Sequence, residues 1–296
     1  MIYVVVGPTG SGKTSTVCQL AEKYHLPIIN ADAFQIYQEM NIGTAKISKD
    51  NPLYKSHYLL DIVKPNETYS VKQYQHDFNN IIEKLKNEYS NIIICGGTGL
   101  YVRAAIYDYT FPEQEDIDTS KYDKYSNEEL YEMLLKIDKE SAEKIHKNNR
   151  KRVIRALAYA EGGMTKSEND ANQKHELRFP NNEIKVLFLN PNREELYANI
   201  NKRVDEMFEL GLVDEVKSLL NKYELSLTAK QAIGYKEVID YLHGELSIDE
   251  CKELIKKRSR NYAKRQVTFF KHQFDTIEFK TSLDLYNFIN STIKYD

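Results

Sequence analysis

The chain of 296 residues has few cysteines and no long apolar run. Its three cysteines, Cys18, Cys95 and Cys251, lie far apart without C-x-x-C spacing, so neither a disulfide framework nor a zinc site is expected. No apolar stretch approaches the ~20 residues that cross a bilayer, and the N-terminus lacks the pattern of an export signal. These absences predict a globular cytoplasmic protein with no membrane partner.

The net charge of −3 does not by itself predict a polyanionic partner, but the charges are sorted along the chain. Acids prevail in residues 113–143, and residues 252–272 are strongly basic, with Glu253 as the only acid. Residues 144–155 contain no acid and six basic residues, namely Lys144, Lys147, Arg150, Lys151, Arg152 and Arg155. Such stretches suit either RNA binding or solvated helix faces, and composition alone leaves both open.

One motif follows the first apolar run, residues 2–6. It is a complete G-x-x-x-x-G-K-[ST] sequence, Gly7-Pro8-Thr9-Gly10-Ser11-Gly12-Lys13-Thr14. Its glycines let backbone N–H groups converge on phosphate oxygens at a helix N-terminus, and its lysine adds a positive charge. The final hydroxyl, that of Thr14, can hold Mg²⁺. The position between a strand and a helix predicts that this segment, the phosphate loop, binds a diphosphate.

Strand and helix patterns alternate through the first third of the chain. Strands are predicted at 2–6, 27–30, 58–62 and 92–95, and later at 184–189 and 276–279. A helix is expected to begin at Ser70, and its apolar face comprises Val71, Tyr74, Phe78, Ile81 and Leu85. This alternation predicts an α/β fold with a parallel sheet covered by helices. Residues 1–111 and 183–296 are assigned to this core, and residues 112–182 to an inserted helical module.

Polar residues follow the second and fourth predicted strands. Asp32 is expected to face the phosphate loop, because the carboxyl ends of parallel strands share one crevice. There it would act as a general base, hold Mg²⁺ through water, or merely cap the next turn. Gln35 offers an amide that suits an adenine edge. In the segment 96–101, glycines would permit close approach to a ligand, and Thr98 would reach a phosphate oxygen, unless the segment is only a tight turn.

Two further charged residues, Asp61 and Arg203, are candidates for the same crevice. Asp61 is a candidate for the acidic Mg²⁺ partner that nucleotide-hydrolysing enzymes place near the phosphate loop. Arg203 would neutralise charge on a leaving diphosphate, but the residue pattern alone favours a surface ion pair with Asp205 or Glu206.

Taken together, these segments resemble the tRNA dimethylallyltransferase family, also called the IPP transferase family. The matching segments are 7–14, 30–37, 42–46, 57–62, 96–101, 152–157, 211–215, 232–236 and 264–269. The resemblance covers nearly the whole chain. It implies a P-loop NTPase-like parallel sheet core flanked by helices, with an inserted all-α tRNA-binding module. It also implies transfer of a dimethylallyl group from dimethylallyl diphosphate to the adenine beside the anticodon, in tRNAs that decode codons beginning with U.

The resemblance assigns roles to individual residues. Residues 7–14 would hold the diphosphate, with Mg²⁺ near Thr14. Asp32 would take the proton from the attacking amine of a flipped-out adenine, while Thr98, Arg203 and Lys13 stabilise the departing diphosphate. Contacts to the anticodon stem-loop are expected from Asp32, Ala33, Phe34, Gln35, Thr98, Arg152, Arg155, Ile233, Gly234, Tyr235, Lys236, Lys264, Arg265 and Gln266.

The sequence departs from the family pattern at four single positions and in the turn at residues 162–165. The family usually has Ala at Gly10, Ser at Ala33, Met at Phe34 and Trp at or near Phe269. Ala33 removes a hydroxyl group from the crevice and any hydrogen bond that it would make there.

Alternatives remain open at this stage. One is an adenylate prenyltransferase of the cytokinin type, which would need neither the module nor the basic stretches. Another is a small-molecule kinase that uses ATP, with Asp32 as base. A third is an RNA-binding module in which the loop only senses nucleotide. No feature of the sequence demands a dimer, and a monomer is expected.

Overall fold

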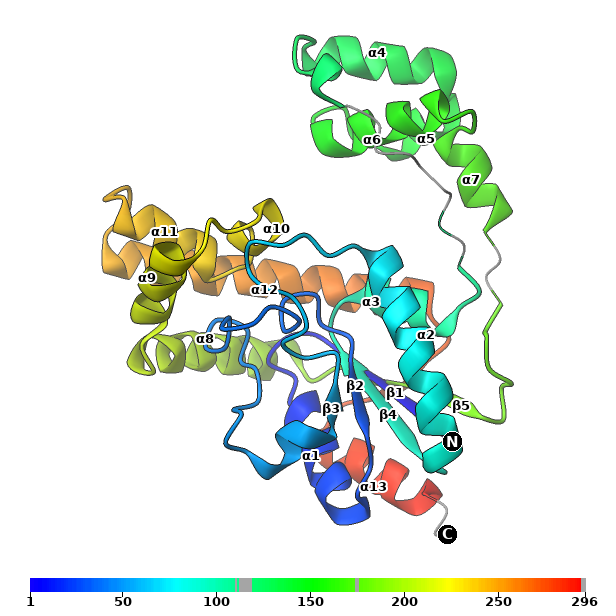
Figure 1. The fold of residues 1–296 in the computed structure, drawn as a ribbon, viewed down its shortest axis with the longest axis vertical. Coiled ribbons are helices and arrows are strands. Elements are labelled where there is room, and N and C mark those ends of the chain that lie inside the picture. Colours follow the sequence, from blue (N-terminus) through cyan, green and yellow to red (C-terminus); the bar gives the residue numbers. More distant parts are fainter. Residues whose placement is uncertain (110, 112–118, 174–175, 294–296) are drawn as a thin grey trace. The chain divides into compact units, whose positions relative to one another are not determined.

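The computed structural model describes residues 1–109, 111, 119–173 and 176–293 (Figure 1). The chain divides into two compact units. Met1–Ile106 with Phe179–Asp296 forms the core unit, and Tyr107–Arg178 forms the helical unit. The predicted boundaries at 112 and 182 lie a few residues beyond these divisions, and 112 itself falls outside the described residues.

A parallel sheet organises the core unit. Among the described residues it has six strands, β1 (Ile2–Val6), β2 (Ile28–Asn30), β3 (His57–Tyr58), β4 (Ile92–Gly96), β5 (Ile184–Leu189) and β6 (Ile277–Phe279). Their order across the sheet is β3-β2-β4-β1-β5-β6, and every pair is parallel. The predicted α/β fold class is confirmed.

The third strand is shorter than predicted. A strand was expected over 58–62, but β3 ends at Tyr58. Leu59 and Asp61 have φ values of 62° and 52°, in the left-handed region that a strand cannot contain. The chain therefore leaves the sheet immediately after Tyr58.

Helices account for most of the remaining core unit. They are α1 (Lys13–Tyr24), α2 (Val71–Glu88), α3 (Gly99–Ile106), α8 (Arg193–Glu209), α9 (Leu212–Lys222), α10 (Leu227–Lys230), α11 (Tyr235–Leu242), α12 (Ile248–Gln273) and α13 (Ser282–Thr292), with one short 3₁₀ helix, η1 (Pro52–Ser56). Along the described stretches, no helix combines the length and the apolarity that crossing a membrane requires.

Helix α2 begins where the sequence predicts. Ser70 forms a capping box with Gln73 and so satisfies backbone groups at the helix start. The buried side chains of α2 are Tyr74, Phe78, Ile82 and Leu85. The predicted apolar face therefore differs at two positions: Val71 and Ile81 are only half-buried, and Ile82 is buried instead.

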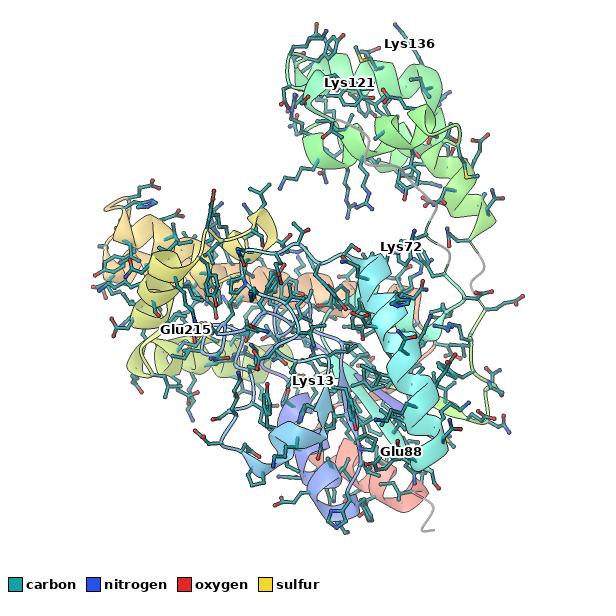
Figure 2. All side chains as sticks on the ribbon, viewed as in Figure 1. Lys13, Lys72, Glu88, Lys121, Lys136 and Glu215 are labelled. Carbon is teal, nitrogen blue, oxygen red and sulfur yellow. The ribbon has the colours of Figure 1, made fainter. Side chains whose placement is uncertain are left out.

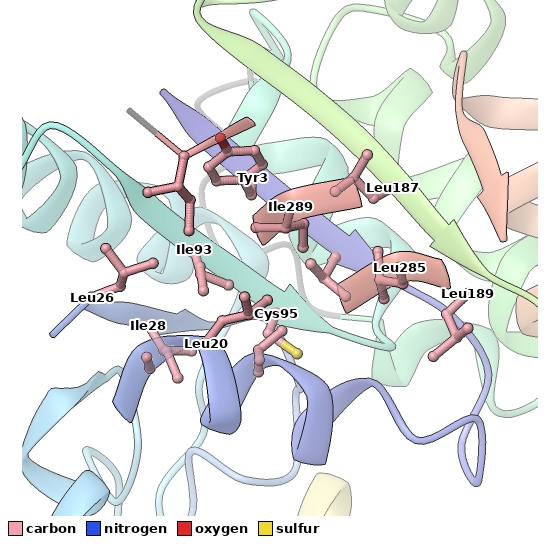
Figure 3. Close-up of a cluster of buried hydrophobic side chains, with 14 residues drawn as sticks. Tyr3, Leu20, Leu26, Ile28, Ile93, Cys95, Leu187, Leu189, Leu285 and Ile289 are labelled. Carbon is pink, nitrogen blue, oxygen red and sulfur yellow. The ribbon is translucent and has the colours of Figure 1, made fainter. Parts of the chain in front are cut away.

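The sheet is covered on both faces. Helices α1 and α13 pack on one face, where Leu20 and Leu285 join apolar side chains of β1, β2, β4 and β5 in one buried cluster (Figure 3). On α2 and α3, Tyr74 stacks on Tyr101 with ring centroids 4.1 Å apart. The Tyr74 hydroxyl donates to the Asn30 carbonyl at 3.0 Å, which ties α2 to the end of β2.

The helical unit contains η2 (Ser120–Tyr122), α4 (Asn127–Ile137), α5 (Lys139–Lys144), α6 (Arg150–Glu161) and α7 (Lys166–Asn172). Its apolar core includes Leu130, Leu134, Val153 and Leu157, which α4 and α6 contribute.

Only part of the basic stretch 144–155 is free to face solvent. Arg150 donates to the carbonyl oxygens of Tyr122 and Tyr125 at 2.8 and 2.7 Å and so holds α6 to the segment before α4. Lys144 pairs with Glu140 at 2.6 Å. The remaining basic side chains, Lys147, Lys151, Arg152 and Arg155, are exposed.

The basic stretch 252–272 also contributes to packing within its own unit. Lys256 pairs with Asp205 of α8 at 2.9 Å. Arg258 contacts Glu237 of α11 at 2.5 Å, and Arg260 donates to Asn201 of α8 at 2.6 Å. Much of this charge therefore binds α12 to its neighbours, and the interpretation as one solvated or RNA-binding face is wrong for these residues.

Asp138 offers a test of what holds the helical unit together. Its buried carboxylate accepts from the backbone N–H of Ser141 at 3.0 Å and of Ser167 at 2.9 Å, so one side chain caps α5 and holds α7. Burial would raise the pKa of the Asp138 carboxylic acid, but these hydrogen bonds outweigh that effect and the pKa is lowered. The contribution to stability is therefore present above about pH 4 and is lost as the pH falls through the folded-state pKa.

We expect Asp138→Ala to lower the free energy of unfolding of this unit by about 2 kcal/mol at neutral pH. Amide hydrogen exchange in α5 and α7 measures the loss. Glu132→Ala, at an exposed position of α4, is the control. Equal protection in the two variants would show that Asp138 does not bridge the helices.

Candidate functional site

Three strand ends meet at one edge of the sheet. Val6 of β1 lies beside Gly96 of β4, and Asn30 of β2 lies beside Cys95 of β4. The segments that follow these strands therefore converge, as expected for a parallel sheet. They open into a cavity of about 280 Å³ that Lys13 and Asp32 both line. The expectation that Asp32 shares a crevice with the phosphate loop is confirmed.

The phosphate loop ends in a helix start that is open to an anion. No side chain caps α1, and its first turn contains no acidic residue, in contrast to the capped start of α2. The backbone N–H groups at this end are therefore available to a negatively charged ligand. The Ser11 hydroxyl is buried and, within the described residues, has no hydrogen-bond partner.

Lys13, labelled in Figure 2, is a half-buried cation at this helix start. Its Nζ donates to the Pro8 carbonyl at 3.0 Å. Burial lowers the pKa of the Lys13 ammonium, Cys95 and Asp32 act in the opposite direction, and Arg203 lowers the pKa further. A bound anion would favour the charged form of the Lys13 ammonium and so offset the cost of this desolvation.

Asp32 performs one of the three functions considered for it, and its position is compatible with the other two. Its Oδ1 accepts from the Phe34 backbone N–H at 2.9 Å, so it caps the following turn. It also lines the cavity that contains Lys13. Within the described residues, Oδ2 accepts no hydrogen bond and is available to a ligand.

Arg203 does not lie in a surface ion pair. From α8 it reaches the cavity, where Nη1 donates to Thr9 Oγ1 at 2.9 Å and Nη2 donates to the Thr44 carbonyl at 3.2 Å. Burial lowers the pKa of its guanidinium group, and the charge of Asp32 raises it. The neighbouring Asp205 and Glu206 instead pair with lysines. The surface interpretation is wrong, and Arg203 is a cavity residue.

Thr98 supports the cavity wall. Its Oγ1 accepts from the Ala33 backbone N–H at 2.9 Å, and its own N–H donates to Ala31 at 3.1 Å. Thr98 is not among the residues that line the cavity, whereas Tyr262 of α12 is. Burial and the charge of Asp32 raise the pKa of Tyr262 to about 12, against a hydrogen bond with Thr98 that lowers it. The expected contact of Thr98 with a phosphate oxygen stays a prediction.

The glycines after β4 make room for side chains of α12. A side chain at Gly97 would lie 2.4 Å from Gln266 Nε2, and one at Gly99 would lie 2.2 Å from the Phe269 ring. The expectation that these two glycines serve close approach of a ligand is therefore wrong. They allow α12 to pack against the end of β4.

Gln266 joins the two glycine-containing loops. Its Oε1 accepts from the Thr9 backbone N–H at 2.9 Å, and its Nε2 donates to the Gly97 carbonyl at 2.8 Å. The side chain is buried, and both ends of its amide are occupied by the backbone. Gln266 also lines the cavity, so its expected contact with RNA stays a prediction.

The segment 233–236 also differs from expectation. Gly234 and Tyr235 are buried, and the Tyr235 side chain is 0% exposed. Neither can contact RNA in this structure, so both predictions are corrected. Ile233 lines the cavity, and Lys236 is half-buried.

The remaining residues predicted to contact RNA lie in three places. Phe34 and Gln35 line the cavity with Asp32, and the half-buried Ala33 lies between them and Asp32 in sequence. Lys264 and Arg265 are exposed and line a groove along α12, and Arg265 also lines the cavity. Arg152 and Arg155 are exposed on α6 of the helical unit.

The candidate metal ligands differ in availability. Asp61 is occupied, because its buried carboxylate pairs with Lys46 at 2.7 Å and accepts from the Tyr54 hydroxyl at 2.5 Å. The suggestion that Asp61 holds Mg²⁺ is therefore wrong.

Thr14 is exposed and lines the cavity with Asp32. Hydroxyl and carboxylate oxygens are ligands that suit Mg²⁺. Among the described residues, no cluster of three His, Cys, Asp or Glu side chains forms a metal site.

Two residues at the site had no individual role in the sequence analysis. His57 lines the cavity, its Nδ1 is hydrogen bonded to the Leu53 carbonyl at 2.8 Å, and burial lowers its pKa. Glu215 accepts three backbone N–H groups from residues 41–43. The only signal for either was its place in a segment of the family resemblance.

Comparison with known proteins decides the family. The model of the family described as IPP transferase matches residues 35–273. The chain belongs to the IPP transferase family. A relative from Halothermothrix orenii named tRNA dimethylallyltransferase is 43% identical over 302 residues, covering 99% of this chain and 91% of the relative.

Solved structures of IPP transferases share the fold. The full-length tRNA isopentenylpyrophosphate transferase of Bacillus halodurans superposes with a TM-score of 0.69 at 33% identity, covering 98% of this chain and 95% of that one. A eukaryotic dimethylallyltransferase, described as acting on tRNA, has a TM-score of 0.73 at 28% identity, covering 97% of this chain and 75% of that one.

The bridge made by Gln266 can be tested in this IPP transferase by Gln266→Ala. The substitution leaves the Thr9 N–H and the Gly97 carbonyl without their buried partner, so we expect a loss of about 2 kcal/mol in the free energy of unfolding. We also expect weaker binding of inorganic pyrophosphate. Denaturant unfolding and calorimetry measure the two effects, with exposed Gln19→Ala as the control. Unchanged values for both would exclude the bridge.

Proposed function

We propose that this protein transfers a dimethylallyl group from dimethylallyl diphosphate to the exocyclic amine of an adenine beside the anticodon of tRNA. The observation that carries the proposal is the arrangement of charge in one cavity. Two half-buried cations, Lys13 and Arg203, line it together with the carboxylate of Asp32. An enzyme that expels a diphosphate and accepts a proton needs both kinds of group. The family membership and the names of the relatives support the same reaction.

The donor diphosphate would bind at the start of α1. The open N–H groups of the helix, Lys13 and Arg203 offer donors and positive charge to its oxygens. Thr14 is the residue that would hold Mg²⁺. When bound, that ion would neutralise charge on the diphosphate.

The acceptor adenine would enter the same cavity as a flipped-out base. Its exocyclic nitrogen attacks the allylic carbon, and the carbon–oxygen bond to the diphosphate breaks with the electron pair leaving on oxygen. Asp32 Oδ2 takes the proton that the nitrogen loses. Arg203 and Lys13 stabilise the negative charge on the departing diphosphate. Gln35, whose Nε2 donates to Thr44, presents its amide oxygen to the purine.

The anticodon stem-loop would bind through basic surfaces on each unit. Arg152 and Arg155 supply charge on the helical unit, and Lys264 and Arg265 supply it on α12. Phosphate contacts of this kind provide most of the affinity for RNA. We propose that the protein works in the cytoplasm on this substrate.

The direct test is transfer of radiolabel from dimethylallyl diphosphate to an unmodified tRNA in the presence of Mg²⁺, with ATP as the alternative donor and AMP as the alternative acceptor. Label in the tRNA alone supports the proposal. Consumption of ATP without prenyl transfer, or prenylation of AMP but not tRNA, would overturn it.

The role of Asp32 predicts a specific loss of activity. Asp32→Asn keeps an oxygen that can accept from Phe34 and removes the base, so we expect transfer to fall by about 10²-fold or more while tRNA binding persists. Single-turnover transfer and filter binding measure the two quantities. The control is Asp50→Asn, at an exposed carboxylate. Full activity of Asp32→Asn would remove Asp32 from the role of base.

The basic face of α6 predicts a change in salt dependence. Arg152→Glu combined with Arg155→Glu should weaken tRNA binding and reduce the slope of log affinity against log salt by about 2, one for each lost phosphate contact. Lys136→Glu combined with Lys139→Glu introduces the same charge change elsewhere on this unit. Equal slopes for the two double variants would show that α6 does not contact RNA.

A further inference from the structure

The loop 41–44 supports two side chains that face the cavity. The carbonyl oxygen of Thr44 accepts from Gln35 Nε2 at 3.1 Å and from Arg203 Nη2 at 3.2 Å. Gln35 and Arg203 therefore share one backbone acceptor, and their positions depend on where this loop lies.

The loop is held by one carboxylate from α9. Glu215, labelled in Figure 2, accepts through Oε2 from the N–H groups of Asn41 and Ile42 at 3.0 and 2.8 Å. Its Oε1 accepts from Gly43 N–H at 3.3 Å and from the Tyr235 hydroxyl at 2.6 Å. Three successive backbone donors thus converge on a single side chain, which fixes the direction of the loop.

Tyr235 closes the other side of this contact. Its ring lies so close to Gly43 that a side chain there would meet Cε2 at 2.4 Å. Burial raises the pKa of Tyr235 well above its usual value, and Glu215 acts in the same direction, so the hydroxyl stays protonated and donates. The loop is confined between a fixed ring and a fixed carboxylate.

A second attachment lies at the far end of α9. Glu39, whose φ of 63° marks a turn, accepts from Lys222 at 2.5 Å and from the Tyr223 hydroxyl at 2.7 Å. Helix α9 therefore holds the segment 39–43 at two points, and Glu215 is the point next to Thr44.

We infer that Glu215 is a positioning residue of this site. It acts through the loop 41–44 to place the guanidinium of Arg203 for the diphosphate and the amide of Gln35 for the purine. The inference deepens the proposed function and rests on it for the identity of the ligands. Glu215 itself does not line the cavity, so it affects the reaction only through the loop and the side chains that the loop holds.

The test is a double-substitution cycle that pairs Glu215→Gln with Arg203→Lys. An amide at position 215 cannot accept at both of its ends, so some of the four donors lose their partner. The probe is inorganic pyrophosphate with Mg²⁺, measured by calorimetry, together with kcat and KM for transfer to tRNA. Asp214→Asn, in the same first turn of α9 and 85% exposed, is the matched control.

If Glu215 acts through Arg203, Glu215→Gln should weaken pyrophosphate binding about tenfold in the natural background and by less than about threefold with Arg203→Lys present. For transfer, we expect kcat to fall by a similar factor, while Asp214→Asn changes neither quantity. Equal losses in both backgrounds, or a fall in melting temperature without any change in pyrophosphate binding or kcat, would overturn the inference.

Pyrophosphate binding needs no prenyl transfer. If the natural protein fails to modify tRNA, the proposed function fails, and the cycle on pyrophosphate still decides whether Glu215 positions Arg203.

Discussion

Two half-buried cations and one carboxylate line the cavity at the edge of the sheet. Lys13 and Arg203 are desolvated enough for burial to lower both pKa values, and the negative charge of Asp32 compensates only in part. An unbalanced buried charge is costly unless a partner neutralises it. The site is therefore prepared for an anion with more than one negative charge. The open start of α1 adds backbone donors for the same ligand.

The guanidinium group of Arg203 also holds the surrounding loops in place. Arg203 links Thr9 of the phosphate loop to Thr44, and Gln266 links Thr9 to the glycine segment after β4. The sheet brings these loops near one another, and helices α8, α9 and α12 then hold them in position. Rigid support of this kind keeps catalytic groups within the small tolerances that chemistry requires. The basic residues of α12 that pair with α8 and α11 belong to this support rather than to an RNA surface.

Sequence patterns predicted the sheet and the shared crevice well, because both follow from local rules. Apolar runs placed five of the strands, and parallel strands necessarily bring the phosphate loop and Asp32 to one edge. The third strand was predicted too long. Leu59 and Asp61 adopt left-handed backbone conformations, and the residue types in this apolar segment do not indicate them.

Side-chain roles set by distant partners could not be predicted in this way. The family resemblance assigned Gln266 to RNA contact, and only the fold shows that its side chain meets Thr9 and Gly97. The same holds for Arg203. The acids next to it in the sequence favoured a local ion pair, but in the structure its guanidinium group donates to Thr9. Glu215 carried no chemical signal at all, since its partners lie about 170 residues earlier in the chain.

The central claim is that the cavity receives an allylic diphosphate rather than a nucleoside triphosphate. Calorimetric competition with a non-reactive thio analogue of dimethylallyl diphosphate, in the presence of Mg²⁺, tests it most directly. The analogue should bind and displace inorganic pyrophosphate, and ATP at equal concentration should not displace the analogue. Tight binding of ATP that excludes the prenyl analogue would contradict the claim.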